Sequence, residues 1–375
     1  MSNDSQQNMH VCHVVTTIER GGAENQLLML AKGQVERGYS VMVCPLKGEL
    51  ELEVEFSNFG VKVVKTLHGI GFLAQIRAMS KLSRNNYSIF HAHLPQAELL
   101  VALSGFRNYV VSRHFGGQFF PGKNSFISRW MSKLAISNAG CVVAISESVA
   151  KYLVLNRELQ QSKLLKVVPY GFDKEVFLRT NLGLSDSGMA PNKRRLFGTI
   201  ARLSEEKDLS TLIRAFHLHQ QNPEFNGNEL EIYGAGPLEN SLRELISELS
   251  LQESVRLMGR TQKPDQIINS FDVFVLTSKF EGFGMVLLEA MSLGKPIICS
   301  RIDTALEVLG ETGAAIFFET GVEADLANKM CELDDLLSLD FKEMQRLRLD
   351  NYSIQNSVDR LHEIYQNLPT TLPRK

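Results

Sequence analysis

Short apolar runs alternate with stretches of helical periodicity along most of this chain. The clearest helical stretch is 23–37, which Gly21-Gly22 precede and Gly38 follows, as expected at the two ends of a helix. Alternation of this kind predicts repeated βαβ units and parallel sheets. The predicted strands lie at 11–17, 41–45, 61–67, 87–93, 109–113, 141–146, 164–169, 196–202, 229–234, 255–259, 272–277, 296–300 and 314–318.

A polar segment divides the chain into two halves. Residues 179–193 contain Gly, Ser and Pro among polar residues, which is the composition of a linker. Because 375 residues exceed the usual size of a single core, we predict two Rossmann-like domains, 1–178 and 194–353, facing each other across a cleft. Ligands of such domains bind outside the carboxyl ends of the strands, so residues that follow the strands are candidate site residues.

The segment 281–289, Glu-Gly-Phe-Gly-Met-Val-Leu-Leu-Glu, follows a predicted strand and carries a carboxylate at each end. Its glycines allow a ligand to approach the backbone closely. A helix that begins near Met285 would direct its amide N–H groups into this loop, where they favour phosphate. Glu289, about one turn into the helix, can accept hydrogen bonds from sugar hydroxyls. The segment suits a sugar-nucleotide pocket, although acidic pairs at this spacing also occur on solvated helices.

Two basic residues follow the strand at 196–202. Arg202 carries a planar guanidinium with paired N–H donors, and Lys207 carries an ammonium group on a flexible side chain. Together they are typical of a diphosphate-binding site. The alternative for Lys207 is a local salt bridge to Glu205 or Asp208 at the start of the next helix. The Gly-x-Gly turn at 234–236 after the next strand is weak evidence, since a plain tight turn explains it as well.

The order of these motifs resembles the donor domain of retaining glycosyltransferases of family 4, which have the α/β GT-B fold. The matching segments are R-x4-K at 202–207, GAGP at 234–237, VRLMGR at 255–260, E-x7-E at 281–289 and LGKPIICS at 293–300. One departure is Ile302-Asp303-Thr304-Ala305-Leu306-Glu307, where relatives usually have a Gly-Gly pair before a Glu. By the same analogy, a final helix at about 354–375 crosses back to the first domain.

The resemblance implies roles for the residues of these motifs. Arg202 and Lys207 would hold the diphosphate, Glu289 the ribose, and Arg260 would border the base, while Glu281 and the 282–284 backbone would contact the transferred sugar. The family uses no bound metal, in keeping with the lack of an Asp-x-Asp motif. The implied donor-binding set is Gly21, Gly22, Arg202, Lys207, Gly259, Arg260, Glu281, Gly282, Phe283, Gly284, Met285, Val286 and Glu289.

The first half resembles the family's acceptor domain more loosely. Gly21-Gly22 matches a glycine loop near the donor phosphates, although a plain βα turn explains it equally well. His91 and His93 share one face of the fourth strand, and His93 is nearest its end. We predict no zinc site, because no third ligand follows at a convincing spacing. Core packing is the alternative for both histidines. The resemblance favours His93 as a catalytic and acceptor-binding residue, joined by Arg113 and His114 at the end of the next strand.

Composition limits the compartment and the partners. The five cysteines are scattered without C-x-x-C spacing, which predicts free thiols in a reducing cytoplasm. No signal peptide or membrane span is visible, and no nucleic-acid partner is expected. Residues 1–175 carry 19 Lys and Arg against 13 Asp and Glu, a net charge of +6, whereas the remainder carries −8. This asymmetry is compatible with an anionic partner for the first half, or with unevenly solvated charge.

The segment 119–134 contains the only tryptophan of the chain. Phe126, Ile127, Trp130 and Leu134 form an apolar stripe, while Lys123, Arg129 and Lys133 lie off it. Such a helix could pack its stripe on the core, or lie on an anionic bilayer at the inner face of the cell membrane next to Phe119-Phe120.

These expectations combine into one hypothesis. The chain would transfer a hexose-type sugar from a UDP- or GDP-sugar to a glycan or lipid-linked acceptor in cell-surface polysaccharide or lipopolysaccharide synthesis. The predicted catalytic residues are His93, Arg202, Lys207 and Glu281. A sugar-nucleotide epimerase of the same fold, which needs no acceptor, and a non-catalytic nucleotide-sugar-binding subunit are the alternatives.

Overall fold

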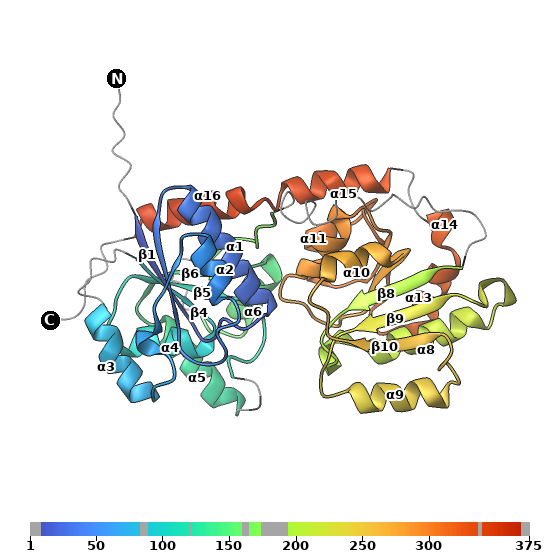
Figure 1. Ribbon diagram of the computed structural model, residues 1–375, viewed down its shortest axis with the longest axis horizontal. Helices are drawn as coiled ribbons and strands as arrows, with labels where there is room; N and C mark the ends of the chain where they lie inside the picture. The colour runs from blue at the N-terminus through green and yellow to red at the C-terminus, as the bar shows by residue number, and fades with distance from the viewer. Residues whose placement is uncertain are drawn as a thin grey trace, which may run out of the picture. The chain divides into compact units, whose positions relative to one another are not determined.

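The computed structural model describes residues 9–82, 89–120, 122, 124–159, 165–173, 194–336 and 340–368. The chain forms two compact units, Met1–Phe172 with Tyr352–Lys375, and Asp173–Asn351. Each unit contains a parallel sheet flanked by helices (Figure 1). The predicted linker at 179–193 lies outside the described residues.

In the part of the chain that the structure describes, the sheet of the first unit has seven parallel strands in the order β3-β2-β1-β4-β5-β6-β7. Continuous apolar runs form them because a parallel sheet covered by helices is buried on both faces. The predicted strands are confirmed, but the run at 61–67 pairs only over two residues and then forms a short 3-10 helix, Lys65–Leu67. The strands are β1 (His10–Val15), β2 (Ser40–Pro45), β3 (Lys62–Val63), β4 (Ile89–His93), β5 (Tyr109–Arg113), β6 (Ala139–Ala144) and β7 (Leu165–Val167).

The helices of this unit form two groups. In one group α3 and α5 pack on α4, and in the other α2 and α16 pack on α1. Gly33 allows α1 to approach α16, since a Cβ there would lie 2.9 Å from Val358 Cγ2. The C-terminal helix therefore belongs to the core of the first unit. The helices are α1 (Gly22–Glu36), α2 (Glu53–Asn58), α3 (Phe72–Leu82), α4 (Pro95–Leu103), α5 (Ser125–Ile136), α6 (Glu147–Leu155) and α16 (Ile354–Gln366).

Over the described ranges 194–336 and 340–351, the sheet of the second unit has six parallel strands in the order β10-β9-β8-β11-β12-β13. The strands are β8 (Leu196–Ile200), β9 (Glu229–Tyr233), β10 (Val255–Gly259), β11 (Val273–Leu276), β12 (Ile297–Ser300) and β13 (Ile316–Phe318). The helices are α8 (Leu209–Gln220), α9 (Glu239–Glu248), α10 (Pro264–Ser270), α11 (Met285–Ser292), α12 (Asp303–Leu309), α13 (Glu323–Cys331), α14 (Leu333–Leu336) and α15 (Phe341–Asp350), and two 3-10 helices, η2 (Glu205–Lys207) and η3 (Pro223–Phe225).

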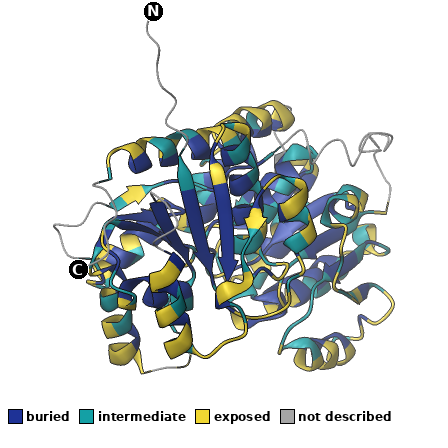
Figure 2. Cartoon of the chain, turned by 60° about the vertical axis from the view of Figure 1, so that its left-hand side comes forward, coloured by how far each residue is buried: buried dark blue, intermediate teal, exposed yellow. Residues whose placement is uncertain are grey.

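Both sheets reverse their strand order at one point, between β1 and β4 in the first unit and between β8 and β11 in the second. The carboxyl ends of the strands at such a switch point are where open α/β sheets bind ligands. The strands are largely buried, and the outer faces of the helices are exposed (Figure 2). Among the described helices, none has the length and apolar character needed to cross a membrane.

Candidate functional site

Lys207 and Glu281 meet at the switch point of the second sheet. Lys207 Nζ lies 2.6 Å from Glu281 Oε1, and Ser278 Oγ donates to the same oxygen at 2.7 Å. The alternative of a local salt bridge for Lys207 is therefore wrong. Asp208 instead accepts from Lys279 Nζ at 3.1 Å. Two of the predicted catalytic residues thus form an ion pair, with side chains 19% and 10% exposed.

Hydrogen bonds between two loops bring this pair together. Thr277 Oγ1 donates to the carbonyl oxygen of Lys207 at 2.9 Å, and Lys279 N donates to that of Glu206 at 2.9 Å. The loop after β8 is thereby joined to the loop after β11. Arg202 lies in the first of these loops, and its side chain is exposed. The loop after β8 therefore carries one charged group that a ligand can reach and one that is held in a largely buried ion pair.

The glycine loop after Glu281 leads into α11 as the sequence predicts. Gly284 takes the left-handed conformation, with φ of 80°, and the helix begins at Met285. Phe283 is buried and fixes the loop to the core. Thr304, from the segment that departs from the family pattern, donates its hydroxyl to the carbonyl oxygen of Glu281 at 2.9 Å. The departing segment therefore still supports the loop, through a side chain.

Glu289 lies in α11, and its carboxylate has no hydrogen-bond or ion-pair partner among the described residues. Burial of the carboxyl group, with a smaller contribution from the charge of Asp265, raises its pKa to about 7. A carboxylate held without a partner beside a glycine loop is free to accept hydrogen bonds from a ligand's hydroxyl groups.

The Gly-x-Gly turn at 234–236 has a packing requirement that the sequence alone does not reveal. A Cβ on Gly234 would lie 1.8 Å from the carbonyl oxygen of Ala201, and one on Gly236 would lie 2.3 Å from that of Leu203. Only glycine lets this loop lie against the segment that carries Arg202. Gly259, with φ of 76°, accepts from Gly234 N at 2.7 Å, and Arg260 after it is exposed.

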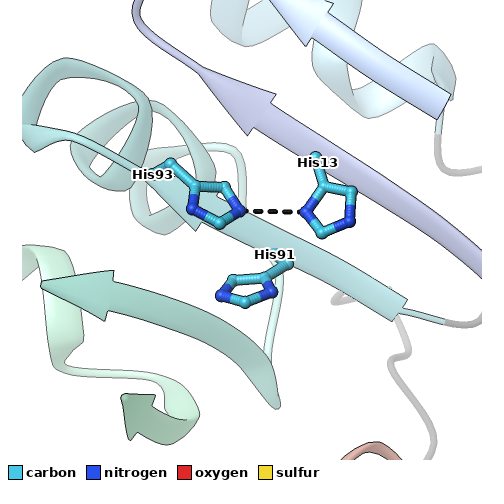
Figure 3. A group of neighbouring side chains, drawn as sticks. All are labelled: His13, His91 and His93. Atoms are coloured by element: carbon cyan, nitrogen blue, oxygen red, sulfur yellow. Dashed lines mark hydrogen bonds between the residues drawn. The ribbon is translucent and has the colours of Figure 1, made fainter. Parts of the chain in front are cut away.

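In the first unit, His93 belongs to a cluster of three imidazoles (Figure 3). His91 and His93 lie on β4, and His13 lies on the neighbouring strand β1, opposite His91 in register. His13 Nδ1 is 2.9 Å from His93 Nε2. His13 was not a candidate in the sequence analysis. Its position on the first predicted strand becomes informative only when β1 and β4 are known to be neighbours.

The three imidazoles would also offer metal ligands, since one ligand atom of each lies within 4.8 Å of the others. Every ring nitrogen already has a protein partner, however: Gln34 and His93 for His13, Tyr365 and Ser112 for His91, and His13 and His114 for His93. Burial lowers the pKa of His13 to about 4 and that of His93 well below its ordinary value. The cluster is thus a neutral hydrogen-bonded network, and the expectation of metal-independent activity stays a prediction.

His93 and His114 reach a small cavity in the first unit. His93 Nδ1 is 3.1 Å from His114 Nε2, and both rings line a cavity of about 30 Å³ together with Ser112 and Tyr170. Apart from these polar side chains the cavity is lined mainly by apolar residues, and a neutral imidazole at its wall can accept or donate a hydrogen bond to a hydroxyl group.

The side chain of Arg113, for which the sequence predicts an acceptor contact, is buried among protein partners. Its side chain is buried, with Nε 2.9 Å from Glu98 Oε2, Nη1 3.4 Å from Glu158 Oε2, and the guanidinium carbon 4.5 Å from the centre of the Phe119 ring. Nη2 also donates to Ser132 Oγ at 2.9 Å. The side chain is buried and both terminal nitrogens have protein partners, so we do not propose an acceptor contact for Arg113.

Gly21 and Gly22 form the start of α1. Gly21 is the N-cap, and a Cβ there would lie 2.5 Å from Glu24 Oε2, whereas a Cβ on Gly22 would meet open space. Thr17 Oγ1 donates to Glu24 Oε1 at 2.8 Å and fixes this carboxylate beside the turn. A Cβ at Gly21 would thus meet only the end of the Glu24 side chain, and a donor contact for both glycines stays a prediction.

Three of the four residues of the apolar stripe of α5 are exposed to solvent, and the fourth, Leu134, packs against the core. Phe126, Ile127 and Trp130 are 75%, 50% and 59% exposed, while Ser128 and Ser132 are buried. The core-packing alternative for these three residues is therefore wrong. Lys123 lies outside the described residues.

Comparison with known proteins places the chain in a family. The family model for Glycosyltransferase Family 4 matches residues 20–176, and that for Glycosyl transferases group 1 matches residues 185–353. EpsF of Bacillus subtilis, a putative glycosyltransferase, is 26% identical over 80% of both chains. CapM of Staphylococcus aureus, a capsular polysaccharide biosynthesis glycosyltransferase, is 25% identical over 96% of this chain and 97% of its own.

The fold is shared with Anabaena HepE, solved in complex with UDP-glucose. The TM-score is 0.78 at 20% identity, covering 96% of this chain and 100% of HepE. The two family models together span both units, and the solved relative has the same two-domain architecture. The chain is therefore a glycosyltransferase of family 4 with the GT-B fold.

Proposed function

We propose that this glycosyltransferase is a retaining enzyme that moves a hexose-type sugar from a UDP- or GDP-sugar to a glycan or lipid-linked acceptor in cell-surface polysaccharide synthesis. The observation that supports this most is the Lys207–Glu281 pair at the switch point of the second sheet, followed by the glycine loop and by α11, which carries the unpartnered carboxylate of Glu289. A cation for phosphate and two carboxylates for hydroxyls are what a nucleotide sugar requires.

Each part of the donor has a counterpart in the second unit. Arg202 and Lys207 would bind the diphosphate, aided by the N-terminal amide groups of α11. Glu289 would accept from the ribose hydroxyls, and Glu281 from the hydroxyls of the transferred sugar. Arg260 would border the base. The similarity to CapM supports a role in polysaccharide synthesis, and the fold shared with HepE supports a UDP-sugar as the first donor to test.

The proposed reaction needs no covalent enzyme intermediate. The bond between the anomeric carbon and the diphosphate oxygen breaks, and the acceptor oxygen bonds to the same face of the sugar. The acceptor's proton passes to the departing phosphate oxygen. Negative charge grows on the diphosphate as it leaves, and the cations Arg202 and Lys207 stabilise that charge. The imidazoles of His93 and His114 in the first unit are proposed to hold sugar hydroxyls, and no metal is required.

A donor panel tests this function. UDP- and GDP-sugars are screened by thermal shift, because a donor that binds the folded protein raises its melting temperature. The donor found is then incubated with acceptors in the presence of EDTA, and the anomeric configuration of the product is determined by NMR. Retention without a metal is the expected result. Conversion of the donor to an epimer without an acceptor would instead identify an epimerase, and binding without turnover a non-catalytic subunit.

The exposed stripe of α5 supports a membrane-borne acceptor. Phe126, Ile127 and Trp130 present aromatic and aliphatic surface to solvent, and Arg129 and Lys133 on the same helix are exposed cations. The helix contains no acidic residue. Apolar side chains at headgroup level with cations beside them fit an anionic bilayer surface. We therefore propose peripheral contact of the first unit with the inner face of the cell membrane and a lipid-linked acceptor.

A further inference from the structure

One glutamine side chain connects four histidines of the first unit, His13, His91, His93 and His114, into a single hydrogen-bonded network. On one side, Gln34 Oε1 is 2.8 Å from His13 Nε2, and the chain continues from His13 to His93 at 2.9 Å and to His114 at 3.1 Å. On the other side, Gln34 Nε2 is 3.3 Å from the hydroxyl of Tyr365, which lies on α16. Gln34, on α1, is fully buried.

The amide of Gln34 determines where the hydrogens of the first branch lie. Its oxygen can only accept, so His13 carries its hydrogen on Nε2. A neutral imidazole has one N–H, so His13 Nδ1 accepts, and His93 must carry its hydrogen on Nε2. The same step leaves His93 Nδ1 as an acceptor for the N–H of His114. Burial keeps all three rings neutral, because it lowers the pKa of His13 and His114 to about 4 and that of His93 well below its ordinary value.

The second branch is oriented in the same way. The amide nitrogen of Gln34 donates to the Tyr365 hydroxyl. That hydroxyl donates in turn to His91 Nδ1, 2.7 Å away, so His91 carries its hydrogen on Nε2 and donates to Ser112 Oγ at 2.7 Å. One amide therefore sets the tautomers of imidazoles on two neighbouring strands.

We propose that Gln34 is a positioning residue that fixes the tautomer in which His93 directs a lone pair, on Nδ1, toward His114 Nε2, at the wall of the cavity that both rings line. A sugar hydroxyl that replaced His114 as the hydrogen-bond partner would then donate to His93 Nδ1. If the amide of Gln34 were reversed, His93 Nδ1 would carry a hydrogen. It would then donate to a ligand oxygen instead of accepting from a hydroxyl. The inference rests on the proposed function in that a sugar hydroxyl is the ligand.

Tyr365 acts on the second branch alone. Replacing it by Phe removes the hydrogen that His91 Nδ1 accepts, while Gln34 Oε1 still accepts from His13. Tyr365→Phe should therefore change the tautomer of His91 and leave His93 as it is, whereas Gln34→Met should release His13 and His93 together.

Two matched controls are available in the same unit. Gln75 is as buried as Gln34, but its amide donates to the carbonyl oxygens of Leu46 and Leu67 instead of to an imidazole. Tyr109 is as buried as Tyr365, and its hydroxyl donates to the carbonyl oxygen of Ala135. Gln75→Met and Tyr109→Phe therefore report the cost of losing a buried hydrogen bond without any change of tautomer.

The experiment measures imidazole nitrogen shifts by NMR in protein labelled with 15N-histidine at neutral pH, with His93 assigned by loss of its signal in His93→Gln. We expect a protonated Nε2 and a bare Nδ1 at His93 in the wild type, in Tyr365→Phe and in both controls, and a mixture of tautomers in Gln34→Met. In kinetics with a donor and acceptor, Gln34→Met should lower kcat/KM about tenfold per folded molecule, and Gln75→Met should not.

Wild-type protein alone can overturn the proposal, even if Gln34→Met does not fold, since a His93 protonated on Nδ1 or mixed between tautomers contradicts it. A Gln34→Met variant that keeps a pure Nε2–H tautomer at His93 contradicts it as well. The NMR measurement needs no substrate, so its outcome is independent of whether the proposed transfer reaction is found.

Discussion

Lys207 Nζ lies 2.6 Å from Glu281 Oε1, although the two residues are 74 positions apart in the sequence. The pair joins the loops after β8 and β11, the two strands between which the strand order reverses. Both side chains are mostly buried, so removing either partner leaves a charge without compensation. The proposed donor-binding groups therefore also stabilise the second unit, and their substitution needs to be judged by stability and by function.

Substitutions of Arg202 and of Lys207 should differ in their effect on stability. Arg202 is exposed, so Arg202→Met should lower donor binding and turnover by roughly 10²-fold with little change in melting temperature, because it removes a charge-assisted contact to phosphate. Lys207→Met should show the same functional loss together with a lower melting temperature, since Glu281 loses its cation. Kinetics and thermal melts check both, with the exposed Arg243→Met as a control that should leave both quantities unchanged. Normal kinetics in Arg202→Met or Lys207→Met would remove that residue from the donor site.

The two carboxylates should separate nucleotide binding from sugar transfer. Glu289→Gln should chiefly weaken binding of the free nucleotide, whose ribose it is proposed to hold. Glu281→Gln should keep nucleotide affinity nearly intact and lower turnover, because its proposed partner is the transferred sugar. Calorimetry with the nucleotide and steady-state kinetics measure the two effects. The opposite pattern would mean that the two roles are exchanged.

The raised pKa of Glu289 predicts opposite pH trends for stability and for binding. A carboxyl with a folded pKa of about 7 favours the protonated form, so its stabilising contribution is complete below pH 4.5 and is lost as the pH rises through 7. Glu289→Gln keeps a neutral side chain, so at pH 8 it should exceed the wild type in stability by of the order of 1 kcal/mol, and at pH 4.5 the two should be equal.

Donor binding should follow the ionised form instead. The affinity for a nucleotide diphosphate sugar, which itself has no group titrating near pH 7, should fall several-fold between pH 8 and pH 6 in the wild type and stay flat in Glu289→Gln. Denaturant melts and calorimetry across this range provide both measurements. Parallel pH curves for the two proteins would show that Glu289 does not titrate there.

The sequence predicts the parts of this fold that depend on local pattern. Continuous apolar runs located the strands, and Gly284 with Met285 located the start of α11, because burial on both faces and a left-handed residue before a helix leave clear signatures. The partner of Lys207 could not be read in the same way, since it depends on which strands are neighbours. His13 was missed for the same reason, because its register with His91 exists only in the assembled sheet.

Two further residues show where periodicity is insufficient. Arg113 ends a strand, as a ligand-binding residue would, but Glu98 and Glu158 from two other elements occupy its guanidinium. Trp130 belongs to an apolar stripe that is typical of a core-facing helix, yet α5 buries its serines instead. Pattern gives the spacing of a stripe, and only tertiary packing decides which face of the helix meets the core.

The exposed stripe of α5 leads to a prediction about membrane contact. Wild-type protein should sediment with vesicles that contain anionic lipid at low salt, and should remain in solution with neutral vesicles, because Arg129 and Lys133 supply the long-range attraction. Phe126→Ser with Trp130→Ser should abolish sedimentation without loss of stability, since both side chains are solvated in the folded protein. Arg129→Glu with Lys133→Glu should do the same.

Leu155→Ser is the matched control for this experiment. Leu155 is 70% exposed but lies on a different helix, α6, so its substitution should leave sedimentation unchanged. If the wild type and all variants stay in solution with anionic vesicles, α5 is not a membrane contact and the acceptor is to be sought among soluble glycans. If Leu155→Ser reduces binding as much as the stripe variants do, the attraction is general surface hydrophobicity, and α5 has no special part in it.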